Sequence, residues 1–275
     1  MGTRLIIVAD VHLATGPLKP GAPDVSYAQG LLREAVDKTL ALRPDQVILL
    51  GDVLNTGAPE EYDQAREILA PLAGRLEPLV GNHELLRGNL TDWKRFWRVA
   101  PHRQMLFGNL PAVLLNSRIE GLPLSQWGGK LDAPQLDLLD DLLRAQPPSP
   151  LLVFCHHPIA HTVRRSDKPM IGLDNSSDLE TRLTGHSRKV VLFSGHAHYQ
   201  SVVSHGPLNC IGAPSLCFWP HGLMIVDIDG PWLHFKTVRL IDEPARSPDR
   251  QAGDAAYRAL AEGQEVDQFG AIPVD

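Results

Sequence analysis

The 275-residue sequence predicts an α/β (α+β) fold in which two β-sheets pack face to face, with helices on their outer faces. Short apolar runs rich in branched side chains, typical of buried strands, recur along the whole chain. Amphipathic segments with helical spacing alternate with these runs to about residue 190, and strand-like segments follow. Polar clusters come directly after strand-like runs in both halves, so we expect one site along the seam of the sheets.

In the first half, strands and helices alternate. The predicted strands are residues 5–9, 47–50 and 79–80. Apolar residues at helical spacing from Ala28 to Leu40 predict a helix that ends before Pro44. A second helix begins near Pro59, and the two glutamates that follow suit the positive end of a helix dipole.

The second half carries more strands. The predicted strands are residues 111–116, 151–155, 190–193, 202–203, 209–211, 223–228 and 232–238. The last four are expected to be antiparallel, because no helix separates them. Thr91 is the predicted N-cap of a helix up to Val99, Asp132-Ala133-Pro134 opens another, and a short one lies near residues 178–183.

Composition narrows the class of protein. One domain is expected over residues 1–242, followed by a polar tail over residues 243–275 that is either mobile or an arm packing on a neighbour. A net charge of −6 gives no reason to expect a nucleic-acid or acidic-membrane surface. No apolar stretch approaches the ~20 residues of a transmembrane helix, and no secretory signal is expected before the first strand. Three cysteines without a paired framework predict a cytoplasmic protein.

Five polar clusters carry most of the chemical information, and each directly follows an apolar run. They are Asp10-Val11-His12, Gly51-Asp52, Gly81-Asn82-His83-Glu84, His156-His157-Pro158 and Gly195-His196-Ala197-His198. One such placement carries little weight, whereas five at expected strand ends indicate a metal centre.

The donor types narrow the choice of metal. Asp10 and His12 are expected to point to the same side of an extended segment, because strand side chains alternate with a period of two. His196 and His198 repeat this spacing, and the two oxygens of Asp52 could bridge two ions. Nitrogen and oxygen donors without thiolate suit Mn, Fe, Zn or Co rather than a structural cysteine-type zinc site.

Charge balance points to a phosphate substrate. Two divalent cations outweigh the carboxylates of Asp10 and Asp52, so the centre is expected to attract an anion. Two ions about 3.5–4 Å apart can activate a bridging water, as hydroxide, for attack on phosphorus. His83 is placed to stabilise the charged transition state or to protonate the leaving oxygen.

The ordered series D-x-H, G-D, G-N-H-[D/E], H and G-H-x-H resembles that of the calcineurin-like metallophosphoesterase superfamily over roughly residues 4–240. The resemblance implies a four-layer αββα sandwich of two mixed sheets. It implies that one metal ion is held by Asp10, His12, Asp52 and His198, and the other by Asp52, Asn82, His156 and His196. It also implies that His83 is the catalytic histidine. Within the superfamily, the chain is most similar to the class III cyclic-nucleotide phosphodiesterase and glycerophosphodiesterase branch.

The expected function is therefore hydrolysis of a small phosphodiester, such as a cyclic nucleotide or a glycerophosphodiester. A phosphomonoesterase of the same fold is an alternative. A nuclease would want a basic groove, and a non-catalytic scaffold would typically have lost ligands that this chain retains. A protein phosphatase is disfavoured, because Thr56 stands where those enzymes carry an arginine after the bridging aspartate. The resemblance also leaves a homodimer open.

Several other residues receive a plainer interpretation. His157 is expected to support His156 rather than bind metal, and Glu84 to cap or orient its turn. The remaining histidines are interpreted as surface or core residues: His102, His161, His186, His205, His221 and His234. The helical spacing of Trp93, Phe96 and Trp97 favours core packing over a base-stacking platform. The stretch Phe218–His221 either lines the pocket or forms a buried turn.

Overall fold

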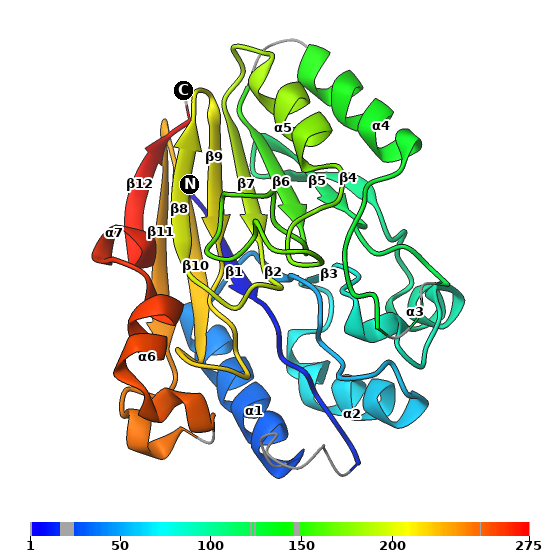
Figure 1. Cartoon of the computed structure of the whole chain (residues 1–275), viewed down its shortest axis with the longest axis vertical. Coiled ribbons are helices and arrows are strands. Elements are labelled where there is room, and N and C mark those ends of the chain that lie inside the picture. Colours follow the sequence, from blue (N-terminus) through cyan, green and yellow to red (C-terminus); the bar gives the residue numbers. More distant parts are fainter. Residues whose placement is uncertain are drawn as a thin grey trace.

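The computed structural model describes residues 2–16, 25–121, 123, 125–145, 149–247 and 249–274. Two six-stranded sheets form its centre, with strand orders β12-β11-β10-β1-β2-β3 and β4-β5-β6-β7-β9-β8 (Figure 1). The first sheet consists of β1 (Thr3–Val8), β2 (Gln46–Leu49), β3 (Leu76–Pro78), β10 (Gly222–Asp229), β11 (Trp232–Arg239) and β12 (Phe269–Pro273). The second consists of β4 (Arg103–Phe107), β5 (Leu110–Leu115), β6 (Leu151–Cys155), β7 (Val190–Ser194), β8 (Ser201–His205) and β9 (Leu208–Gly212).

Both sheets mix parallel and antiparallel pairs. In the first, β1, β2 and β3 are parallel, whereas β10, β11 and β12 pair antiparallel. In the second, β5, β6, β7 and β9 are parallel, and β4 and β8 close the edges antiparallel. The predicted strands are confirmed, although the third lies just before residues 79–80.

Helices cover the outer face of each sheet, so the molecule has four layers. The first sheet is covered by α1 (Val25–Leu42) and α2 (Pro59–Leu69), and the second by α4 (Ala133–Arg144) and α5 (Ser176–Thr184) (Figure 1). Alternation within β1 explains the layering, because Ile6 faces the α1 and α2 cluster while Ile7 faces the second sheet. Phe154 and Phe193 of the second sheet stack in that central layer, with ring centroids 5.2 Å apart. The predicted αββα sandwich is confirmed.

The remaining helical segments are short. They are α3 (Leu90–Trp97), α6 (Ala255–Glu262), α7 (Glu265–Gln268) and 3-10 turns over Ala70–Leu72, His83–Leu85, Pro244–Arg246 and Arg250–Gly253. The N-cap of α3 is Asn89 rather than Thr91, because the Asn89 side chain accepts the amide of Asp92 at 2.9 Å. Trp93 is fully buried, as expected of core packing. Among the described residues, no helix is long and apolar enough to cross a membrane.

The C-terminal segment packs against its own chain. Residues 243–275 were expected to be a mobile end or an arm toward a neighbour, but β12 pairs antiparallel with β11, with Leu233 opposite Ile272. Ile272 and Val274 are buried in the central layer between the sheets. Their side chains bury apolar surface that a free tail would leave in water. The segment therefore ends in a strand of the first sheet rather than as a free tail.

Candidate metal centre

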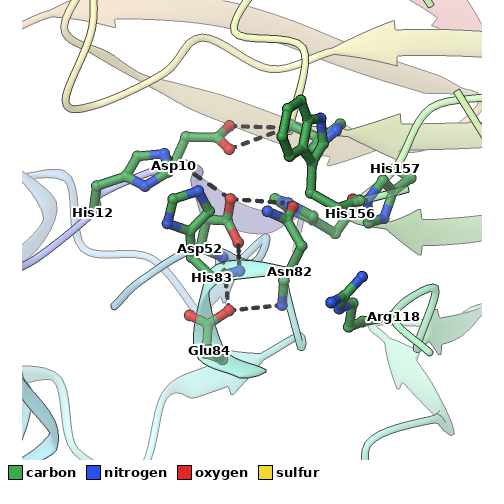
Figure 2. Close-up of polar contacts among 12 residues, drawn as sticks. Asp10, His12, Asp52, Asn82, His83, Glu84, Arg118, His156 and His157 are labelled. Atoms are coloured by element: carbon green, nitrogen blue, oxygen red, sulfur yellow. Dashed lines mark hydrogen bonds and ion pairs between the residues drawn. The ribbon is translucent and has the colours of Figure 1, made fainter. Parts of the chain in front are cut away.

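The five polar clusters meet at the carboxyl ends of parallel strands in both sheets. They follow β1, β2, β3, β6 and β7, and Figure 2 shows side chains from four of them around one point. Three groups of candidate ligands have donor atoms within 4.8 Å of one another: Asp10, His12 and His198; His12, Asp52 and His83; and Asp52, His156 and His196. Asn82 joins the third group, with its Oδ1 3.2 Å from Nε2 of His156.

Left-handed backbone conformations, rather than the alternation of side chains along a strand, orient the donor side chains. β1 ends at Val8, and Asp10 and His12 have φ of 53° and 49°. Asp52, His196 and His198 lie in the same region, with φ of 51°, 62° and 60°. The predicted reason for the D-x-H and H-x-H spacing is therefore wrong, because neither pair lies in an extended segment. Such conformations cost about 1–3 kcal/mol each and persist where surrounding structure enforces them.

Glycines allow the clusters to approach. A Cβ on Gly51, whose φ is 92°, would lie 2.4 Å from Nδ1 of His156. A Cβ on Gly81 would lie 2.2 Å from both the amide nitrogen and Oδ1 of Asp52. Any side chain at either position would push two donor clusters apart.

The first donor group contains two imidazoles that face each other. Nε2 of His12 lies 3.4 Å from Nε2 of His198, which in turn lies 3.4 Å from Oδ1 of Asp10. Burial and the neighbouring His83 lower the pKa of His12 to about 3, so its imidazole is neutral. The ring of Phe218 stacks on His198 at 4.7 Å and fixes its plane.

In the third donor group, hydrogen bonds to backbone carbonyls orient the two histidine rings. His156 donates from Nδ1 to the carbonyl of Leu50 at 2.8 Å, which leaves Nε2 at 3.3 Å from Oδ2 of Asp52. His196 donates from Nε2 to the carbonyl of Met170 at 2.9 Å, which leaves Nδ1 as its free nitrogen. These bonds set the tautomer of each ring, as is usual for metal-ligating histidines.

Asp52 lies between His12 of the first donor group and His156 of the third. Its Oδ2 is 3.3 Å from Nε2 of His156 and 4.0 Å from Nε2 of His12. Although burial raises the pKa of Asp52, the charges of His156 and His83 hold it well below its usual value. Burial alone would lower the pKa of His156, but Asp52 raises it to about 9. A buried carboxylate that faces imidazole nitrogens on two sides is a donor set that suits two transition-metal ions.

His83 is held by hydrogen bonds from its ring and from its backbone. Its Nδ1 donates to the carbonyl of Asn55 at 2.7 Å, because a carbonyl only accepts, so Nε2 is the free nitrogen. Its backbone amide donates to Oδ1 of Asp52 at 2.8 Å. The ring meets that of His12 edge-on, with centroids 4.4 Å apart. His83 thus lies beside the donors with one nitrogen available.

Glu84 has a larger supporting role than a local cap. Its buried carboxylate accepts backbone amides of Asp52, Val53, Leu54 and Gly81 at 2.6–3.1 Å. Burial and Asp52 raise the pKa of Glu84 to about 7, whereas its backbone donors favour the charged form. The carboxylate therefore ties the Asp52 turn to the Asn82 turn.

His157 has no nitrogen left for a metal. Its Nδ1 lies 2.8 Å from Oγ of Ser117, and its Nε2 donates to the carbonyl of Trp127 at 2.8 Å. Burial and the adjacent His196 and His156 hold the pKa of His157 well below its usual value. The neutral ring packs against that of His196, with centroids 4.2 Å apart.

A cavity of about 440 Å³ opens above the donors. Its lining residues fall into two sets, which we call the floor and the rim. The floor consists of the candidate ligands and His83: His12, Asp52, Asn82, His83, His196 and His198. The rim consists of the other lining residues apart from Ala197: Trp127, Arg165, Ile171, Tyr199, Phe218, Gln251 and Tyr257. The stretch Phe218–His221 was expected either to line the pocket or to form a buried turn. Phe218 lines the rim, whereas Trp219 is buried. Except for Phe218, sequence reasoning did not find the rim, which comes from loops and the C-terminal segment.

The fold and the floor define a class of protein, the metal-dependent phosphoesterases with two mixed sheets. Residues 3–200 match the model of the calcineurin-like phosphoesterase family, and the chain belongs to that family. It is therefore a hydrolase of this class.

Curated relatives and solved structures agree with the family. The chain is similar to a 3',5'-cyclic-nucleotide phosphodiesterase of Nostoc sp., with 29% identity over 215 residues that cover 77% of each chain. It is 26% identical to a cAMP/cGMP dual specificity phosphodiesterase of Mycobacterium tuberculosis, over 78% of this chain and 67% of that one. A dimetal phosphatase from Danio rerio has the same fold, with a TM-score of 0.72 and 15% identity over 99% of both chains.

Proposed function

We propose that this protein is a binuclear metal-dependent phosphodiesterase that hydrolyses a small phosphodiester, either a cyclic nucleotide or a glycerophosphodiester. The relatives named as cyclic-nucleotide phosphodiesterases support the substrate class. The observation that carries the proposal is Asp52, whose carboxylate faces His156 on one side and His12 on the other at the floor of the cavity.

The residues present fit two metal ions. Asp10, His12, Asp52 and His198 would hold one ion, and Asp52, Asn82, His156 and His196 the other. Mn, Fe, Zn or Co match these nitrogen and oxygen donors. When bound, such a pair supplies positive charge for the phosphate oxygens and lowers the pKa of water toward neutrality.

The chain's own residues orient the substrate and move the proton. Asn82 lies at the floor beside the candidate ligands, with an amide that can donate to a phosphate oxygen. His83, held by Asn55, can donate a proton from Nε2 to the leaving alkoxide when the ring is charged. Glu84 preserves the spacing between Asp52 and Asn82 while these steps occur.

Metal content and a substrate pair test the proposal. Protein loaded with Mn²⁺ should contain about two ions per chain and hydrolyse bis(p-nitrophenyl) phosphate faster than p-nitrophenyl phosphate. Protein treated with chelator should lose this activity and regain it with Mn²⁺. A loaded protein inactive on every diester would refute the proposal, and faster cleavage of the monoester would favour a phosphomonoesterase.

The cytoplasmic location and a homodimer stay predictions.

A further inference from the structure

Trp127 is a large aromatic residue held at the mouth of the cavity. Its side chain lines the rim and is 40% exposed. Single exposed apolar residues are ordinary, and Trp232, 44% exposed at the start of β11, is one of them. Trp127 differs because its exposed ring borders the same cavity as the phosphoesterase donors.

Buried groups fasten the backbone on both sides of this ring. His157 donates from Nε2 to the carbonyl of Trp127 at 2.8 Å, and Arg118, only 4% exposed, donates to the carbonyl of Gln126 at 2.7 Å. A Cβ on Gly129 would lie 2.5 Å from the ring of His157, so the chain runs directly against that ring. The backbone at Trp127 is thus held in place, while the residue remains 40% exposed at the cavity.

A partly exposed indole carried by a tethered backbone suits a planar ligand. Aromatic side chains stack on nucleobases, and this contact is tolerant of base identity because every base has a π-face. A glycerol group offers no such face. Phosphate at the floor and a base at Trp127 would use both parts of the cavity at once.

We propose that Trp127 is a specificity-determining residue that stacks on the nucleobase of the substrate, and that His157 positions it. This rests on the proposed phosphodiesterase function and selects a nucleotide as its substrate. His157 follows the candidate ligand His156 in the chain, and its ring packs on that of His196. It thereby connects the candidate metal ligands to Trp127.

Ligand binding tests the stacking. The probes are a slowly hydrolysed phosphorothioate analogue of cyclic AMP, and inorganic phosphate as a base-free ligand, titrated calorimetrically into Mn²⁺-loaded protein. Trp127→Ala should lower the affinity for the nucleotide analogue by about 10-fold or more, while the affinity for phosphate stays within about twofold of the parent's. Trp127→Phe should retain most of the affinity, and Trp232→Ala, the matched control, should change neither ligand.

Other results would overturn the inference. They are an unchanged nucleotide affinity in Trp127→Ala, an equal loss for nucleotide and phosphate, or no nucleotide binding by the parent protein. Because the readout is binding, a parent that binds the analogue through Trp127 but cleaves no diester would refute the proposed function alone.

The positioning role of His157 has its own readout. With cyclic AMP as substrate, His157→Ala should raise KM more than it lowers kcat, because the base contact shifts while the floor remains. His157→Gln, whose amide can still donate to the Trp127 carbonyl, should restore part of the affinity. Equal behaviour of the two variants, or a fall in kcat alone, would contradict this role.

Discussion

The floor and the rim of the cavity are built in different ways. Floor donors follow strands of both sheets, most of them lie on left-handed backbone, and most are buried. Rim residues such as Trp127, Arg165 and Tyr257 come from loops and α6, and they are partly or fully exposed. The comparison teaches that the two parts depend on different features of the chain: the floor donors follow short motifs at strand ends, whereas the rim depends on how loops and the C-terminal segment pack.

The strongest test of the floor is Asp52→Asn. It should lower kcat by about 10³-fold or more for every diester. The substitution removes the carboxylate charge that faces His12 and His156, and the metal-dependent stabilisation that would be lost is worth several kcal/mol. Metal analysis of the same protein should show less than the parent content. The matched control is Asp63→Asn, whose side chain is 75% exposed. Equal metal content in Asp52→Asn and the parent would contradict the bridging role.

His83→Ala is expected to have a smaller effect on the floor. It should lower kcat by about 10²-fold, since it removes one proton transfer, while both ions stay bound. Rate measurements beside elemental analysis separate the two effects. A variant that loses an ion would show that His83 is a ligand.

Glu84→Gln tests the support beneath the floor. Glutamine has an NH₂ group in place of one carboxylate oxygen. This group cannot accept a hydrogen bond, so buried backbone N–H groups that bond to Glu84 lose their acceptor. The free energy of unfolding should fall by about 1–3 kcal/mol, measured by urea denaturation. Glu60→Gln, at an exposed position of α2, is the control. Unchanged stability would show that the four amide contacts are dispensable.

His157→Ala should leave the metal content unchanged. Both nitrogens of His157 are engaged by Ser117 and Trp127, so the variant should keep two ions. Elemental analysis checks this directly. Loss of one ion would assign His157, rather than His156, to the centre.

The sequence predicted the fold and the clustered floor because both depend on local patterns. The apolar run before Asp52 predicts both a buried strand and a donor at its end. The sequence predicts the orientation of the Asp10 and His12 side chains from strand alternation, because a positive φ at a non-glycine residue has no clear sequence signal. Trp127 and Tyr257 were missed because their place at the rim depends on long-range packing of loops and the C-terminal segment.

Left-handed backbone at five donor positions sets a limit on how robust the protein can become. Each of these residues would be more relaxed as glycine, so substitutions that ease the chain are the ones that delete a donor. Selection for thermal tolerance alone would therefore erode the chemistry first. All five positions hold non-glycine residues in this sequence, so the chain carries backbone strain at the positions that supply its donors.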